Sequence, residues 1–120
     1  MGMEKSFENK IKRFLEEQGC WFVKFHANAY TKSGIPDILV CCNGFFLGVE
    51  VKAPNGRPSA LQIYNLRKID ASGGYGILLY PKDWQLFKDF VLCMKSGDVE
   101  TVIMKYDLLK ERWCNHAGLA

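Results

Sequence analysis

The segment GIPDILVCCNGFFLGVEVK, residues 34–52, decides the fold of this chain. Residues 38–42 are a continuous apolar run, and Asn43-Gly44 after them is a strong signal for a two-residue hairpin turn. Residues 45–52 then return as a second strand. The segment therefore predicts an antiparallel hairpin.

This hairpin would bring three charged residues to one end of the sheet. Asp37 begins the first strand, and Glu50 and Lys52 end the second. Because strand side chains alternate between faces, Glu50 and Lys52 point the same way. Charge near an apolar core is costly unless it is paired or bound to a metal ion. Mg²⁺ prefers oxygen ligands, so Asp37 and Glu50 are candidate ligands for it.

Two interpretations of these residues compete. Pro-Asp often begins a turn, and Glu-x-Lys is common on the exposed face of a hairpin. The other interpretation is metal-dependent phosphodiester cleavage, with the backbone carbonyl of Val51 as a third oxygen ligand and Mn²⁺ able to substitute for Mg²⁺. In that reading Lys52 stabilises negative charge on the phosphate or holds the attacking water as hydroxide.

The same segment resembles the VRR-NUC group of the PD-(D/E)XK nuclease superfamily. Residues 34–39, GIPDIL, are similar to its G-x-P-D-hydrophobic step, and residues 48–57, GVEVKAPNGR, to its E-V-K-x-x-x-G-R segment. Residues 59–62, SALQ, are similar to the S-x-x-Q that follows. The resemblance extends from the first helix to about residue 80. It implies a restriction-endonuclease-like fold and a metal-dependent DNA nuclease with these core site residues: Asp37, Glu50 and Lys52.

The first helix is predicted approximately from Met3 to Gln18, and Gly19 ends it. Its core-facing stripe consists of Phe7, Ile11, Phe14 and Leu15. Glu8 lies at the edge of that stripe, so its carboxylate is directed partly toward the body of the protein. The resemblance implies a glutamate here that binds metal or orients water. We choose Glu8 over Glu4 for this role, with a solvated rim carboxylate as the alternative.

Gln62 has two predicted roles at the start of the second helix. Residues 58–62 resemble a capping box, in which Ser59 caps the helix and Gln62 reaches back to the Ser59 amide. Leu66 and Ile69 lie on the same helical stripe as Gln62, and an amide on an apolar face needs partners. The end of the Glu50 strand would offer them. The residues leave both roles open, and the resemblance favours a catalytic-site role.

The remaining elements follow from apolar runs and turn residues. Residues 21–25 are predicted as the first strand, and residues 75–80 as a buried strand after the Gly73-Gly74 stop. Asp83 is expected to cap a third helix whose Met and aromatic stripe belongs to the core. Residues 101–104 are predicted as an edge strand. Residues 106–113 are predicted as a short helix, with exposed apolar groups near it available for self-association.

We therefore expect one α/β domain with a restriction-endonuclease-like mixed central sheet flanked by helices. Its element order is α-β-β-β-α-β-α, followed by a tail. The motif-bearing core spans about residues 4–95, and residues 96–120 form a C-terminal extension. A chain of 120 residues that is 48% hydrophobic is consistent with one compact domain.

The net charge of +3 suits an anionic partner without demanding one. Several basic side chains fall near the predicted site and could grip phosphates, although for each of them a solvated surface is the alternative. Tyr30, in the polar loop 26–34, is available to stack on a base. The candidate DNA contacts are Lys24, Tyr30, Lys32 and Arg57, with Arg67, Lys68 and Lys82 nearby.

Several other classes of protein lack support in the sequence. The five cysteines form no C-x-x-C pair, which argues against a disulfide framework or a structural zinc ion. His26 and His116 are isolated and are expected to have surface or hydrogen-bonding roles, with His26 the runner-up for catalysis. There is no Walker motif, so no nucleotide cofactor is expected. The chain shows no membrane span or signal peptide, and we expect a cytoplasmic protein, in the host cell if it is viral.

The function predicted from these observations is that of a Mg²⁺-dependent DNA endonuclease. Its expected substrate is branched DNA such as a Holliday junction, and its expected state is a homodimer, because a two-fold pair of sites suits a symmetric branch. Two alternatives remain. One is a noncatalytic nucleic-acid-binding module on the same fold, and the other is a protein-interaction domain with an incidental motif.

Overall fold

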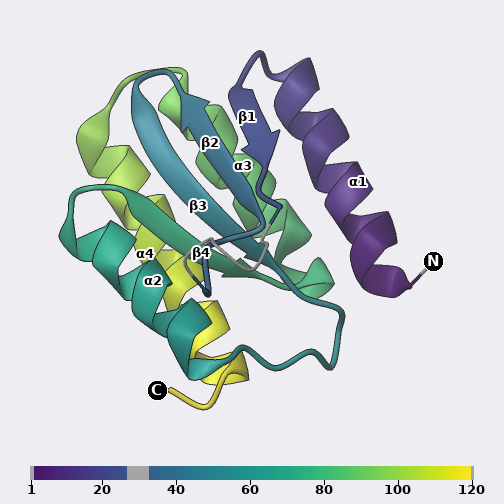
Figure 1. The fold of residues 1–120 in the computed structure, drawn as a ribbon. Coiled ribbons are helices and arrows are strands. Elements are labelled where there is room, and N and C mark those ends of the chain that lie inside the picture. The colour runs from purple at the N-terminus through teal and green to yellow at the C-terminus, as the bar shows by residue number, and fades with distance from the viewer. Residues whose placement is uncertain (1, 27–32, 120) are drawn as a thin grey trace.

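The structure is a computed structural model that describes residues 2–26 and 33–119. Within these residues the centre is a four-stranded sheet in the order β1-β2-β3-β4 (Figure 1). The strands are β1 (Trp21–Lys24), β2 (Ile38–Cys42), β3 (Phe45–Val51) and β4 (Tyr75–Leu79). β1 pairs with β2 and β2 with β3 in antiparallel fashion, whereas β3 and β4 are parallel. The predicted mixed sheet is confirmed.

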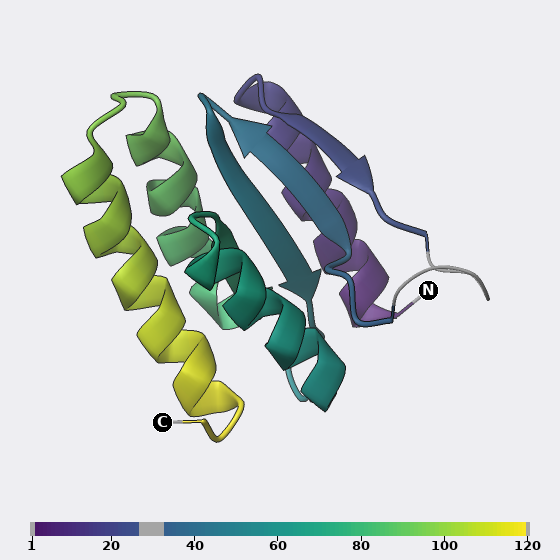
Figure 2. The same cartoon turned by 60° about the vertical axis from the view of Figure 1, so that its left-hand side comes forward.

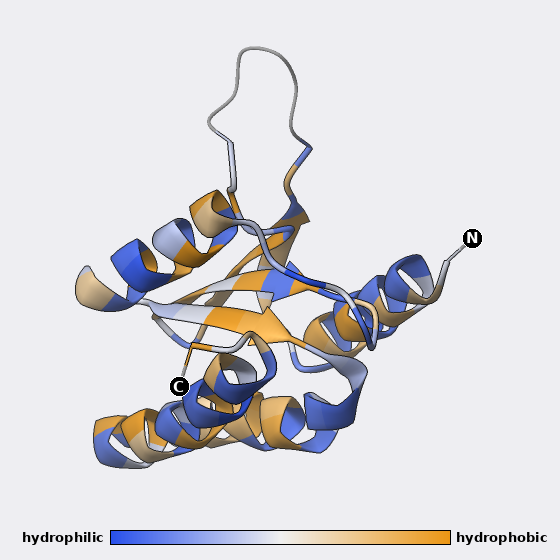
Figure 3. Cartoon of the chain, turned by 90° about the horizontal axis from the view of Figure 1, so that it is seen from below, coloured by the Kyte–Doolittle hydropathy of each residue, from blue (hydrophilic) through white to orange (hydrophobic). Residues whose placement is uncertain are grey.

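Helices cover both faces of the sheet. α2 (Ala60–Ala71) packs against β3 and β4 on one face, and α3 (Trp84–Met94) and α4 (Val99–His116) lie together on the other (Figures 2 and 3). α1 (Met3–Glu17) lies along β1 and contacts α3 through aromatic pairs. A short 3₁₀ turn, η1 (Pro81–Asp83), joins β4 to α3. This is a restriction-endonuclease-like α/β arrangement in one compact domain, as predicted.

The hairpin turn sets the register on which the site depends. Asn43 and Gly44 have positive φ angles of 49° and 87°, as a two-residue turn between twisted strands requires. With this turn, Ile38 pairs with Val49 across β2 and β3. Because the two strands are antiparallel, Asp37, one residue before Ile38, lies opposite Glu50, one residue after Val49.

Two glycines allow α2 to lie close to the sheet. A Cβ atom on Gly76 would stand 2.2 Å from the Leu66 carbonyl oxygen, and one on Gly48 would stand 2.6 Å from the Ile69 side chain. At Gly76 only a residue without a side chain permits this approach of helix backbone to strand, whereas at Gly48 the atom approached is the end of the Ile69 side chain. The close packing places the first turn of α2, which carries Gln62, over the end of β3.

The apolar stripes of the helices form the core on the other face of the sheet. The predicted stripe of α1 is buried, and so is the Met and aromatic stripe of α3. Fully buried side chains here include Ile11, Leu15, Phe87, Phe90 and Met94. At about 25 cal/mol per Å² of apolar area, burial of each such side chain stabilises the fold by roughly 1.5–3 kcal/mol.

The prediction of an edge strand at residues 101–104 was wrong, because these residues belong to α4. Thr-Val-Ile is a β-branched run typical of strands, but tertiary packing outweighs that propensity. The side chains that α4 buries are spaced at helical intervals, and they are Val102, Tyr106, Leu109 and Trp113. The short helix predicted at residues 106–113 is thus the second half of an 18-residue helix. None of the helices in the described residues is long and apolar enough to cross a membrane.

The predicted side-chain cap by Asp83 was also wrong. Asp83 stands at the N-cap position of α3, but its side chain makes no capping hydrogen bond. The carboxylate instead contacts α4: Arg112 Nε donates to Oδ1 at 3.0 Å, and His116 Nε2 lies 3.2 Å from Oδ2. The charged guanidinium of Arg112 stabilises a buried carboxylate more strongly than one backbone amide would.

Candidate active site

Asp37 and Glu50 meet at the end of the hairpin. The backbone N–H of Val51 donates a 2.8 Å hydrogen bond to Asp37 Oδ2, which fixes the aspartate against the last residue of β3. Glu50 precedes Val51, and its side chain lies on the α2 face of the sheet. The structure thus brings together the two carboxylates that the sequence singles out.

Glu50 is buried and incompletely paired. Only 3% of it is exposed. Gln62 Nε2 donates to Glu50 Oε2 at 3.0 Å, and Lys52 Nζ stands 3.8 Å from the same oxygen. The other oxygen, Oε1, is buried without a hydrogen-bond partner among the described residues. Burial, reinforced by the negative charge of Asp37, raises the pKa of Glu50 to about 8, although Lys52 opposes the shift.

Gln62 makes the contacts expected for both of its predicted roles. Its backbone N–H donates to Ser59 Oγ at 3.1 Å, and its side-chain oxygen accepts from the Ser59 N–H at 2.9 Å, which completes the capping box. Its side-chain nitrogen donates to Glu50. One amide therefore joins the start of α2 to the candidate site.

Glu8 occupies a different environment on α1. It is 4% exposed and is surrounded by three ammonium groups, with Lys24 at 2.9 Å and Lys5 and Lys12 each at 3.2 Å. Burial alone would raise the pKa of Glu8, but the hydrogen bond and charge of Lys24, with hydrogen bonds from Lys5 and Lys12, lower it to about 2. Glu8 is therefore a carboxylate that is held ionised.

Lys24 connects this cluster to the hairpin. Its Nζ lies 2.9 Å from Glu8 Oε1 and 3.3 Å from Asp37 Oδ1. Burial would lower the pKa of Lys24, but the two carboxylates raise it, so the bridge is charged. Glu8 thus reaches Asp37 through Lys24. Glu4 lies on the exposed side of α1, and its charge contributes to the raised pKa of Glu50, so the choice between Glu4 and Glu8 stays a prediction.

The donor set is consistent with a magnesium site that has few protein ligands. The described residues contain no group of three or more His, Cys, Asp or Glu side chains placed to hold a metal ion. Mg²⁺ needs only one or two carboxylates, because it retains waters and takes oxygens from substrate phosphates. The unpartnered Oε1 of Glu50, beside Asp37, is an oxygen that such a cation would satisfy. The roles of Asp37, Glu50 and the Val51 carbonyl as ligands stay predictions.

Asn65 is a structural contributor that the sequence reasoning missed. It is buried, and its side-chain nitrogen donates to the backbone carbonyls of Ser33 and Leu61 at 3.2 and 3.0 Å. The bond to Ser33 attaches the segment before Asp37 to α2, while the bond to Leu61 lies within the helix. The available signal was its position three residues after Gln62, on the same side of the helix.

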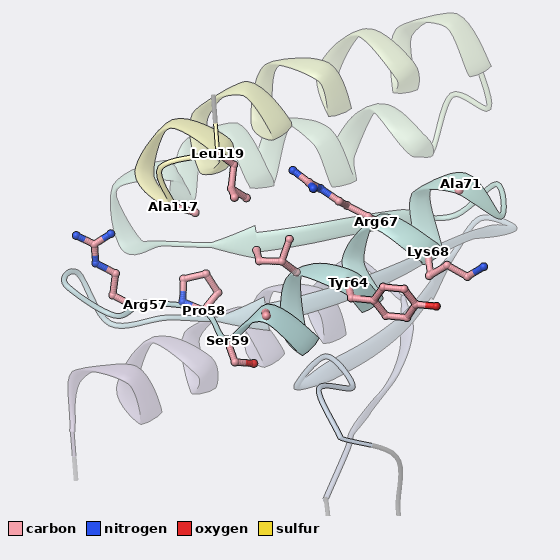
Figure 4. A pocket seen from close by; sticks show the side chains of 11 residues that line it. Arg57, Pro58, Ser59, Tyr64, Arg67, Lys68, Ala71, Ala117 and Leu119 are labelled. Carbon is pink, nitrogen blue, oxygen red and sulfur yellow. The ribbon is translucent and has the colours of Figure 1, made fainter.

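The other predicted contacts are dispersed around the site. Tyr30 and Lys32 lie outside the described residues. Arg57 is exposed in the loop after β3, and His26 is exposed after β1. A groove of about 760 Å³ runs between α2 and the end of α4, and Figure 4 shows Arg67 and Lys68 along it. Nothing in the described residues identifies what would cover this groove.

Comparison with known families decides the assignment. A family model described as archaeal Holliday junction resolvase (hjc) matches residues 3–73. The chain belongs to this family. It is a PD-(D/E)XK-type nuclease family, which confirms the predicted superfamily. The match covers α1 through α2 and includes every described candidate site residue, whereas β4, α3 and α4 lie beyond it. Searches of curated proteins and of solved structures found no match.

Proposed function

We propose that this protein is a Mg²⁺-dependent DNA endonuclease that cleaves branched DNA, Holliday junctions among them. The observation that carries the proposal is the buried Oε1 of Glu50 beside Asp37, which has no hydrogen-bond partner within residues 2–26 and 33–119, in a chain of the resolvase family. A noncatalytic binding module would retain this costly arrangement without using it. The VRR-NUC pattern of residues 34–62 supports the same set of catalytic residues.

Asp37 and Glu50 would hold the cation, with the Val51 carbonyl as a third protein oxygen. When bound, Mg²⁺ or Mn²⁺ polarises the phosphoryl group and lowers the pKa of a coordinated water. Lys52 places its ammonium 3.8 Å from Glu50 and would stabilise the charge that develops on the phosphate. Its side chain is only 12% exposed, so water screens that interaction less than it would at the surface.

The remaining residues would position the two carboxylates. Gln62 orients Glu50 through the 3.0 Å hydrogen bond, and it is itself fixed by Ser59. Lys24, held by Glu8, orients Asp37 from the other side. These contacts would keep the ligands in place before the cation and the DNA arrive, which reduces the reorganisation that catalysis requires.

A homodimer is the proposed active state. One chain has one such site, whereas resolving a four-way junction requires two symmetric cuts. A two-fold dimer presents paired sites to a symmetric branch. Branched DNA is the proposed partner, with Lys24, Tyr30, Lys32 and Arg57 as candidate contacts.

The direct test is cleavage of a four-way junction and of a linear duplex with the same arm sequences, with Mg²⁺, with Mn²⁺ and with chelator. We expect metal-dependent cuts at symmetric positions on two strands of the junction and little cleavage of the duplex. Light scattering should show a dimer. A monomer that cuts duplex and junction equally would contradict the dimer and the substrate preference, and absence of cleavage with either metal would contradict the nuclease assignment.

A further inference from the structure

A small polar cavity lies beside the candidate active site. Its volume is about 210 Å³, below the roughly 300–1,000 Å³ typical of pockets for drug-sized ligands, so it suits a small group. It lies beyond the carboxyl ends of the parallel strands β3 and β4, where ligands bind in open α/β sheets. Its lining residues are Pro54, Asn55, Gly56, Arg57, Tyr80, Lys82 and His116.

Two cations in this cavity lack a partner of opposite charge. No ion pair links Arg57 or Lys82 to a carboxylate within residues 2–26 and 33–119. Asp83, which precedes α3 next to Lys82, is 1% exposed, forms an ion pair with Arg112 and lies 3.2 Å from His116. The cavity therefore has excess positive charge, which favours an anion.

The loop that carries Arg57 is fixed in place and contacts the active site. Tyr80 Oη donates a 2.9 Å hydrogen bond to the Gly56 carbonyl, which ties the loop to the end of β4. On the other side Gly56 packs against Lys52, since a Cβ atom there would lie 3.2 Å from Lys52 Cδ. Only the loop that contains Gly56 would thus separate an anion in the cavity from the Lys52 ammonium, which we assign to the scissile phosphate.

We propose that this cavity binds one backbone phosphate of the DNA strand that enters the active site, with Arg57 and Lys82 as its cationic contacts. The proposal rests on the proposed function, because the bound phosphate would fix the position of the DNA strand that the active site cuts. Phosphate contacts position a protein on DNA without reading its sequence. Arg57 lies within the matched residues 3–73, whereas Lys82 and His116 lie outside them, so the C-terminal half of the chain supplies part of this subsite.

The first test measures junction affinity with Ca²⁺ in place of Mg²⁺, so that the DNA stays intact. Arg57→Gln and Lys82→Gln should each weaken binding about tenfold, as expected for the loss of a charged hydrogen bond. The slope of log K against log salt should become shallower by about 0.9 for the lost phosphate contact. Lys95→Gln is the matched control, because this exposed lysine beside the β2–β3 turn removes the same charge at the other end of the sheet. It should change affinity by less than about twofold.

The second test locates the phosphate. Single methylphosphonates, which are uncharged, are placed one at a time along the strand near the cut site. We expect one position at which the substitution weakens wild-type binding about tenfold but leaves Arg57→Gln and Lys82→Gln almost unaffected. If the two variants respond to every methylphosphonate as the wild type does, the proposal is wrong.

The outcomes separate this proposal from the proposed function. Suppose that the wild-type protein binds the junction but does not cut it, and that both variants lose the methylphosphonate effect. That result would refute the nuclease and support the subsite. Normal cleavage and binding by both variants would refute the subsite and leave the nuclease intact. A third outcome is that inorganic phosphate stabilises the wild type but not Arg57→Gln against heat, while Arg57→Gln binds the junction as the wild type does. The cavity would then bind free phosphate and not DNA, which overturns the proposal.

Discussion

The two sides of the candidate site hold buried glutamates with opposite electrostatics. On the α1 side, Glu8 is 4% exposed and contacts three lysines, which lower its pKa to about 2. On the β3 side, Glu50 is 3% exposed and has Asp37 beside it, and one of its oxygens has no hydrogen-bond partner in the described part of the chain. Burial and the charge of Asp37 raise its pKa to about 8. Burial raises the pKa of both carboxyl groups, and at Glu8 the lysine partners outweigh it. The cationic partners satisfy Glu8, whereas Glu50 has fewer of them and is the carboxylate that we propose as a metal ligand.

The largest expected effect is the loss of cleavage when Asp37 or Glu50, on the β3 side, loses its negative charge. Asp37→Asn and Glu50→Gln should each lower the cleavage rate at least about 10³-fold, because each removes an anionic ligand with little change of volume. Junction binding in Ca²⁺ should largely survive. Single-turnover cleavage with Mg²⁺ measures the effect, and Lys95→Gln serves as the control. Wild-type turnover in either variant would show that the metal site is assigned wrongly.

Lys52→Ala should lower the cleavage rate by about 10²–10³-fold, the range for removal of one preorganised donor to a developing charge. Because Lys52 is assigned to the phosphate and not to the cation, metal affinity measured by calorimetry should change little. A parallel loss of metal affinity would instead give Lys52 a structural role beside Glu50.

The third prediction contrasts the two glutamates through the pH dependence of stability without metal. For Glu50, the folded state retains a proton that the unfolded state releases between pH 4.5 and about 8, so the free energy of unfolding falls as pH rises through that window. Glu50→Gln removes this penalty. The variant should be more stable than the wild type at pH 8, by roughly 4 kcal/mol, and similar to it below pH 4.5.

Glu8 should show the opposite behaviour. Its folded-state pKa lies below the ordinary 4.5, so its contribution is present above pH 4.5 and is lost as pH falls toward about 2. Glu8→Gln should destabilise the protein by about 2 kcal/mol at neutral pH and flatten this acid decline. Urea unfolding at several pH values measures both variants. If the two substitutions shift stability in the same direction at pH 8, the contrast between the two sides is wrong.

How much of this could be predicted from the sequence depends on the separation of the interacting residues. The Asn43-Gly44 turn and side-chain alternation were sufficient to bring Asp37 level with Glu50, because a two-residue turn leaves one register. Lys5 and Lys12 also follow from the sequence, since they stand three and four positions from Glu8 on one helix. Lys24 does not, because only the packing of α1 along β1 brings it there.

The C-terminal half was harder to predict because its signals conflict locally. The β-branched residues of α4 favour a strand over a few residues, while the helical stripe becomes clear only over the whole length of the helix. Asp83 matched a capping pattern, yet its partners Arg112 and His116 come from a helix roughly thirty residues later. Local rules cannot predict a contact of that separation. The sequence suggested Arg57 and Lys82 as phosphate contacts, but for the same reason it could not place His116 beside them in one cavity.

The smallest expected effect is at Gln62, where helix capping and site support meet. Gln62→Ala should lower stability by about 1 kcal/mol through loss of half the capping box, and should also lower the single-turnover rate about tenfold, because Glu50 loses the donor that orients it. Ser59→Ala is the matched control. It removes the hydroxyl that caps the helix but leaves the Gln62 to Glu50 hydrogen bond available, so it should lose similar stability with little loss of rate. Thermal melts and single-turnover cleavage of both variants test this. Equal rates per folded molecule would show that Gln62 acts only as a cap, so that Glu50 depends on Asp37, Lys52 and the cation for its orientation.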